Sequence, residues 1–141
     1  MSWFRGLMSS NVSRDPEGRR ISSPSITTLA PDEVFVFGSN AAGLHGGGAA
    51  RVAHERFGAV WGKGHGLHGQ SYAIDTMSGH ETMLGEIAEF VAFAAQHPER
   101  TFLVTEVGCG IAGYTPAQVA PAFRGASANV ALPESFLDAS D

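Results

Sequence analysis

Two glycine-rich turns supply the groups in this sequence that are best suited to chemistry on an anion. The first follows the apolar residues 34–37 and leads into a run of helix formers, and the second follows the apolar residues 101–107. Backbone N–H groups in such turns, together with the positive end of a helix, favour phosphate or diphosphate. The candidate ligand-binding residues are Ser39, Asn40, Gly43, Gly46, Gly47, Gly48 and Ala49 in the first turn, and Gly108, Cys109, Gly110, Ile111, Ala112, Gly113 and Tyr114 in the second.

The glycines could instead serve only to form tight turns. Neither turn carries the Gly-Lys-Ser/Thr of a P-loop, and neither spells Gly-x-Gly-x-x-Gly after its strand. Two such turns at equivalent places nevertheless favour binding over structure alone. If their strands are neighbours in a parallel sheet, the turns face one another across the crevice beyond the carboxyl ends of the strands.

Few side chains near these turns could act as a general acid or base. His45 lies between Asn40 and the glycine run, so we expect it to face the crevice, where an imidazole can exchange a proton near neutral pH. Asp75 ends a predicted strand and is the best carboxylate for activating a water. Glu106, at the mouth of another strand, is a further candidate, as are three residues of a glycine-rich loop, Lys63, His65 and His68. Each has a structural alternative: a turn residue for His45 and Asp75, a paired acid for Glu106, and exposed positions for the loop residues.

The chain has one cysteine, Cys109, between two glycines. A thiol at the start of a helix-capped loop can be activated, but no histidine is tied to this one by sequence, so we interpret it as a small residue that positions the backbone. A single cysteine forms no internal disulfide, and no residue set resembles a structural zinc site. We therefore expect no metal, no cofactor and a reducing, cytoplasmic setting.

The elements that must position these residues alternate along the chain. Apolar runs predict strands at 34–37, 71–74, 101–107 and 129–132, with a weaker candidate at 26–29. Helical spacing and end signals predict helices at 49–57, 80–97 and 115–123. Residues 58–70 hold five glycines, which predicts a long loop. This order is typical of an α/β fold with a mixed, largely parallel sheet between helices.

At 141 residues the chain is most simply one domain. We expect a flexible lead-in at 1–24, in which Ser2-Trp3-Phe4 or Arg20-Ile21-Ser22 could dock as an edge strand, a single domain at 25–136 and a tail at 137–141. The net charge of −5 argues against a global basic field for nucleic acid. No stretch has the composition of a signal peptide or a membrane span.

The two turns, in this order, resemble those of the macrodomain family of ADP-ribose-binding modules. Asn40 on the strand-end turn, Gly46-Gly47-Gly48 and Ala49 stand where macrodomains carry an Asn, a glycine run and a small helix-opening residue. The string Gly108-Cys109-Gly110-Ile111-Ala112-Gly113-Tyr114 matches the family's second loop. The resemblance covers roughly residues 33–132. It is closest to the branch that includes the terminal ADP-ribose protein glycohydrolase, and to small phage-type and bacterial macrodomain-like proteins with Phe-Gly-Ser-Asn and Gly-Leu-x-Gly-Gln-Ser-Tyr-Ala-Ile.

The resemblance implies a three-layer α/β/α macrodomain-like fold in which both loops grip the diphosphate. It also implies that Asn40 bonds the distal ribose and that Tyr114 packs against it, although a tyrosine in the core or capping it is an equal alternative. The sequence departs from the family at several places. Ala50 stands where many hydrolytic members have Asp, and Asp75-Thr76-Met77 and Ala112 replace the Lys and Asp of the glycohydrolase branch. No acid occurs at 25–28, where the adenine-contacting Asp should fall.

These observations predict an ADP-ribosyl hydrolase that removes terminal ADP-ribose from a modified protein side chain or nucleic-acid base. In this hypothesis Asn40 orients the ribose, and His45 or Asp75 assists the water or the leaving group. Two alternatives stay open: a non-catalytic ADP-ribose reader, and a phosphatase-type enzyme acting on ADP-ribose 1″-phosphate. We expect a monomer whose partners are ADP-ribose and the modified protein or DNA, with no membrane. A DNA substrate would need a local basic rim, for which Arg51, Arg56 and Lys63 are the candidates.

Overall fold

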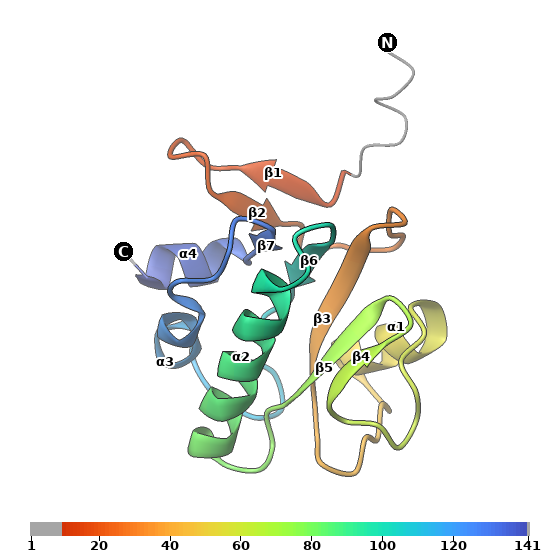
Figure 1. Cartoon of the computed structure of the whole chain (residues 1–141). Helices are drawn as coiled ribbons and strands as arrows, with labels where there is room; N and C mark the ends of the chain where they lie inside the picture. Colours follow the sequence, from red (N-terminus) through yellow and green to blue (C-terminus); the bar gives the residue numbers. More distant parts are fainter. Residues whose placement is uncertain (1–9, 141) are drawn as a thin grey trace.

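A five-stranded sheet forms the centre of the molecule. The computed structural model describes residues 10–140, and Figure 1 shows the sheet with helices packed against it. The strand order is β4-β5-β3-β6-β7. The central β3 (Glu33–Ser39) pairs in parallel with β5 (Ser71–Asp75) and with β6 (Thr101–Val104). Beyond these, β7 (Val130–Ala131) is parallel to β6, and β4 (Gly66–His68) is antiparallel to β5. The predicted mixed, largely parallel sheet is confirmed.

The side chains of β3 enter two separate cores, because successive residues of a strand point to opposite faces. On one face Phe35 and Phe37 pack with Ala53 of α1 (Gly48–Arg56). On the other face Val34 and Val36 join a larger core. That core is covered by α2 (His80–Ala95), α3 (Pro116–Val119), the 3-10 helix η2 (Ala120–Phe123) and α4 (Glu134–Ser140). The result is the expected three-layer α/β/α arrangement.

Local sequence signals account for the buried face of α2 and for the start of α3. In α2 the residues Met83, Ile87, Phe90 and Ala94 are buried at the spacing of one helix face. At α3 the Thr115 hydroxyl accepts a hydrogen bond from the backbone N–H of Gln118, and the Gln118 side chain accepts one from the Thr115 N–H. This reciprocal pair satisfies two N–H groups that a helix start leaves without partners.

The register of the sheet brings three strand ends to one edge. Ser39 of β3 lies opposite Asp75 of β5, and Val36 lies opposite Val104 of β6. A methyl group added at Gly38 would lie 3.2 Å from the Thr76 hydroxyl oxygen and 3.5 Å from the Gly108 nitrogen. The turns after β3 and β6 therefore start side by side at the carboxyl edge of the sheet.

The N-terminal region corrects the prediction of a flexible lead-in at 1–24. Its described part forms an antiparallel hairpin of β1 (Val12–Arg14) and β2 (Arg20–Ser22), which lies beside β7 (Figure 1). The Ser22 hydroxyl donates to the Val104 carbonyl at 2.6 Å. The Asn11 amide donates to the buried Glu33 carboxylate at 3.1 Å. These long-range bonds join the hairpin to the domain, so a boundary at residue 25 is wrong. The suggested edge strand at 20–22 is confirmed, and the one at 2–4 lies outside the described residues.

Three other expectations were wrong in detail. Residues 26–29 form no strand. The supposed loop at 58–70 includes β4, because an antiparallel partner on β5 can order a glycine-rich segment that has no periodicity of its own. The tail at 137–141 begins inside α4, where Phe136 and Leu137 are buried.

Candidate functional site

A cleft at the carboxyl edge of the sheet brings the two glycine-rich turns together. It has a volume of about 940 Å³, which is within the range of small-molecule sites. We call it the glycine cleft. One wall is formed by residues 47–50 and another by residues 107–112, while the N-terminal hairpin and residues 133–135 close the remaining sides. The predicted juxtaposition of the two turns is confirmed.

The first wall presents open backbone at the start of α1. Gly47 precedes the helix with extended dihedrals, and no side chain caps this helix end. Gly48 has φ +58, a left-handed conformation that a side chain disfavours. A Cβ atom added at either glycine would meet no heavy atom within 4 Å. The N-terminal N–H groups of α1 are thus accessible from the glycine cleft, where the helix dipole favours an anion.

The second wall is a turn held by its own backbone. The Cys109 N–H donates to the Glu106 carbonyl, and the Tyr114 N–H donates to the Gly108 carbonyl at 2.8 Å. Gly108 has φ +78 and lies against Met83, so this glycine is required by conformation and packing. At the tip Ile111 is 94% exposed. The turn is firmly based at Gly108 and open at its tip.

The charged side chains that line the glycine cleft are both acidic. They are Glu106 and Glu134, and the described lining contains no lysine, arginine or histidine. The Ser135 hydroxyl donates to the Glu106 carboxylate at 2.6 Å. A phosphate in this cleft would therefore be held by backbone N–H groups and a helix end rather than by cationic side chains.

Cys109 lines the glycine cleft, and its surroundings favour the protonated form of the thiol. Partial burial raises its pKa, and the negative charge of Glu106 raises the pKa further. Since the thiolate is the nucleophilic form, this environment opposes nucleophilic catalysis. The interpretation of Cys109 as a residue that positions the backbone agrees with this.

His45 does not face the glycine cleft, and the expectation that it would is wrong. Its side chain is 1% exposed and packs edge-on against Phe37. The ring Nε2 lies 3.0 Å from the Val60 carbonyl oxygen, and Nδ1 lies 3.2 Å from the Ser39 hydroxyl. Because a carbonyl only accepts, Nε2–H donates to the Val60 carbonyl, and Nδ1 shares a hydrogen bond with the Ser39 hydroxyl. Both nitrogens serve the core, and neither is available to a substrate.

Asn40 and Asp75, the other two predicted catalytic residues, also lie outside the lining of the glycine cleft. The Asn40 side-chain amide makes two hydrogen bonds to the backbone of Leu44 within the first turn. Its oxygen accepts from the Leu44 N–H at 2.9 Å, and its nitrogen donates to the Leu44 carbonyl at 3.0 Å. The Asp75 carboxylate accepts from the Met77 N–H and from the Ser78 hydroxyl. Both side chains fix turns, which was the alternative considered for Asp75.

Eight of the fourteen predicted ligand-binding residues line the glycine cleft, and six do not. The lining set is Gly47, Gly48, Ala49, Gly108, Cys109, Gly110, Ile111 and Ala112; the others are Ser39, Asn40, Gly43, Gly46, Gly113 and Tyr114. Gly43 has a packing role, because a Cβ atom there would lie 2.3 Å from the backbone nitrogen of Lys63. Tyr114 packs its ring against His80 rather than toward the cleft.

The N-terminal hairpin also lines the glycine cleft, which was not predicted from the sequence. Asn11, Ser22, Ser23, Ser25 and Ile26 all contribute to its wall. These residues are separated from both glycine turns in sequence and carry no motif. A serine-rich segment ending in Ser-Pro-Ser-Ile was visible as a turn signal, but only the docking of β2 beside β7 places it at the cleft.

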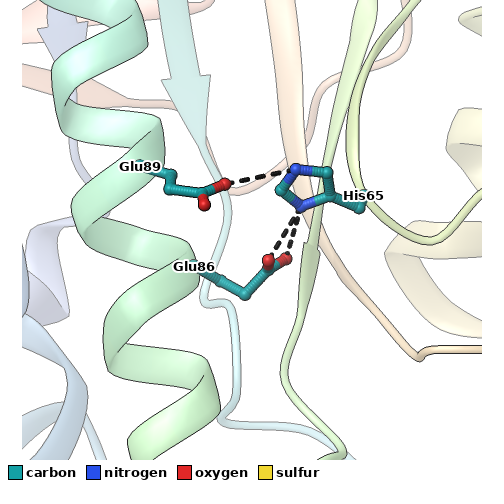
Figure 2. A group of neighbouring side chains, drawn as sticks. All are labelled: His65, Glu86 and Glu89. Atoms are coloured by element: carbon teal, nitrogen blue, oxygen red, sulfur yellow. Dashed lines mark hydrogen bonds and ion pairs between the residues drawn. The ribbon is translucent and has the colours of Figure 1, made fainter.

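A second group of titratable side chains lies outside the glycine cleft, between α2 and the loop before β4 (Figure 2). The His65 ring faces Glu86 through Nδ1 at 2.8 Å and Glu89 through Nε2 at 3.2 Å. The hydrogen bond to Glu86 raises the pKa of His65, and the nearby negative charges add to this effect against partial burial. The sequence offered His65 as a candidate acid or base on a glycine-rich loop, and its two glutamate partners were not predicted. The Glu-x-x-Glu spacing on one helix face was the available signal.

Comparison with protein-family models, with curated proteins and with solved structures finds no match to this chain. No helix among residues 10–140 combines the length and apolar character needed to cross a bilayer. The fold and the glycine cleft define the class: a three-layer α/β protein with a cleft between two glycine-rich turns.

Proposed function

We propose that the glycine cleft binds ADP-ribose or a closely related diphosphate-linked nucleotide. The observation that carries the proposal is the meeting of two open glycine-rich walls at the carboxyl edge of a parallel sheet, with the uncapped start of α1 in one of them. A helix of nine residues whose first N–H groups have no side-chain cap is suited to a diphosphate. The resemblance of both turns to macrodomain loops supports ADP-ribose among such ligands.

In this proposal the diphosphate lies between residues 47–49 and 109–111. The nucleoside extends along the hairpin wall, where the Ser23 and Ser25 hydroxyls and the Ile26 side chain offer polar and apolar contacts. The Glu106 and Glu134 carboxylates repel an anion in the glycine cleft. Hydrogen bonds from backbone N–H groups would therefore have to hold the diphosphate. ADP-ribosylated protein or DNA would be the macromolecular source of the ligand.

Calorimetry with ADP-ribose, and with ADP and ribose 5-phosphate as partial ligands, tests this proposal. Gly47→Glu places a carboxylate at the open start of α1, and we expect it to weaken ADP-ribose binding at least tenfold. Gly85→Glu makes the same change at an open glycine on α2, away from the glycine cleft, and should leave affinity unchanged. No measurable binding of ADP-ribose to the wild-type chain, or equal affinity in both variants, would contradict the proposal.

Hydrolysis of an ADP-ribosyl bond is a second candidate function, and Glu106 is the observation that favours it. Its carboxylate lines the glycine cleft beside the second turn and accepts a hydrogen bond from Ser135. In such a reaction Glu106 would take a proton from a water that attacks the anomeric carbon. The bond to the modified group would break with its electron pair going to that group, which then takes up a proton.

Release of ADP-ribose from a modified protein or oligonucleotide separates the enzyme from the reader. Glu106→Gln should abolish release while ADP-ribose still binds, and Glu99→Gln, at an exposed acid outside the glycine cleft, is the control. Binding without release over long incubation would leave the reader function and exclude hydrolysis of the tested linkages.

A further inference from the structure

The His65, Glu86 and Glu89 side chains bring three metal-ligand groups together outside the glycine cleft (Figure 2). The two glutamates stand three residues apart on one face of α2, and the histidine reaches them from the loop before β4. One donor atom from each lies within 4.8 Å of the other two. Ligands about 2.0–2.1 Å from a tetrahedral zinc ion lie about 3.4 Å from one another. The two glutamates now face different nitrogens of the His65 ring, so an ion bound to one nitrogen would require the other carboxylate to turn toward it.

The charge around this group is not balanced by the protein. Glu86 and Glu89 make their ion pairs with His65, and neither pairs with a lysine or arginine in the described part of the chain. Asp75 adds a third carboxylate to the field at His65. Even a fully protonated imidazole would offset one of these three negative charges. A dication would offset two and would also satisfy the His65 nitrogen and both glutamates.

We propose that His65, Glu86 and Glu89 bind a divalent transition-metal ion, with Zn²⁺ as the preferred ion. An imidazole with two carboxylates is a donor set that suits zinc, whereas Mg²⁺ favours a set made of oxygens alone. Three protein ligands leave a position for water. This site goes beyond the proposed function, since none of its residues lines the glycine cleft.

The ion would join α2 to the loop that packs against the first glycine turn. In α2, Glu86 already accepts a hydrogen bond from the Asp75 N–H at 3.0 Å. The loop carries His65, and its Gly62 N–H donates to the Gly43 carbonyl at 2.9 Å. Bound zinc should therefore raise the thermal stability of the domain without contacting a nucleotide.

Metal binding to the full chain, without an affinity tag and freed of metal by a chelator, tests the site. Titration with ZnCl₂ in a non-chelating buffer should show one ion per chain and a rise in Tm that EDTA reverses. Glu89→Gln, at an exposed position, should weaken zinc binding at least tenfold without unfolding the protein. His65→Ala should do the same, and CoCl₂ should give visible d–d absorption in the wild type that both variants lose.

His97→Ala is the matched control, because His97 also faces a glutamate, Glu99, at 3.2 Å but has no second carboxylate in its group. It should bind zinc like the wild type. Absence of a one-to-one zinc complex, or equal zinc affinity in the wild type and Glu89→Gln, would overturn the proposal and leave an ion pair between His65 and the two glutamates. Either result is independent of ADP-ribose binding.

Discussion

The first glycine-rich turn divides into two regions of similar composition and opposite environment. Residues 40–45 pack against the loop at 59–64, and residues 47–49 line the glycine cleft. A Cβ atom at Gly43 would collide with the backbone nitrogen of Lys63, whereas a Cβ atom at Gly47 would have no heavy atom within 4 Å. Glycine is thus required in one region for backbone packing and in the other for backbone access. A glycine run alone does not show which role applies.

The polar residues of the two regions differ in the same way. His45, in the packed region, is buried with both ring nitrogens bonded within the core. Glu106, beside the open second turn, is exposed and lines the glycine cleft. Histidine is the commoner general acid or base in enzymes, yet here His45 has a structural role and Glu106 is the residue that lines the glycine cleft. Substitutions in each region, and the reactivity of Cys109, test this division.

Gly64→Ala should be the most damaging single change to the packed region. The added Cβ would lie 1.8 Å from the Asn40 carbonyl oxygen, and backbone on both sides must move to relieve the overlap. We expect a loss of about 3 kcal/mol or more in the free energy of unfolding, measured by urea denaturation. Gly46→Ala, with open space around the new methyl group, is the control and should change it by less than about 0.5 kcal/mol. Equal effects in both variants would remove the distinction between packed and open glycines.

His45→Ala should destabilise the chain without a specific effect on ligand binding. It removes packing against Phe37 and the hydrogen bond to the buried Ser39 hydroxyl, while the Val60 carbonyl keeps only the bond from the Lys63 N–H. We expect a loss of about 2–4 kcal/mol in unfolding free energy. Calorimetry at a temperature where the variant is folded should give wild-type affinity for ADP-ribose. An unchanged Tm together with lost activity would restore His45 as a catalytic residue.

Gly48→Ala tests the open region. There we expect the backbone conformation, and not a steric collision, to destabilise the variant. The residue has φ +58 and no neighbour within 4 Å of a new Cβ. We expect a loss of about 1 kcal/mol in unfolding free energy, the cost of one left-handed alanine. Thermal denaturation measures it, and a loss as large as that of Gly64→Ala would show that residue 48 is packed rather than open.

The reactivity of Cys109 offers the mildest test. Burial and the charge of Glu106 raise the pKa of its thiol, so less thiolate exists at a given pH than in an ordinary cysteine. Alkylation by iodoacetamide at mildly alkaline pH should therefore be slower than for a small-molecule thiol. Glu106→Gln removes the negative charge, which should lower the midpoint of the pH–rate profile and speed the reaction. A midpoint below that of an ordinary thiol would contradict the assignment of Cys109 as unreactive.

The sequence was informative where a signal is local. The unbroken apolar run at 34–37 predicted a strand buried on both faces, and β3 is that strand. Thr115, Pro116 and Gln118 predicted a capped helix start, because the bonds that make a cap lie within four residues.

The sequence was uninformative where position depends on distant partners. Strands of three residues such as β1 and β2 have too few side chains to show a period, and Asn11 and Ser22 are fixed by Glu33 and Val104 far along the chain. Nothing local could therefore place the hairpin at the cleft. The side to which His45 points is set by the Val60 carbonyl, fifteen residues away. The position of His45 between Asn40 and the glycine run therefore could not show which way its side chain points.

A crystal structure of the chain with ADP-ribose tests the central claim most directly. We predict that the diphosphate lies in the glycine cleft, with its oxygens within hydrogen-bond distance of backbone N–H groups at 48–50 and at 110–112. Asn40, His45 and Asp75 should keep the contacts they make within the protein. A diphosphate bound elsewhere, or held by any of those three side chains after the turn has rearranged, would contradict the account.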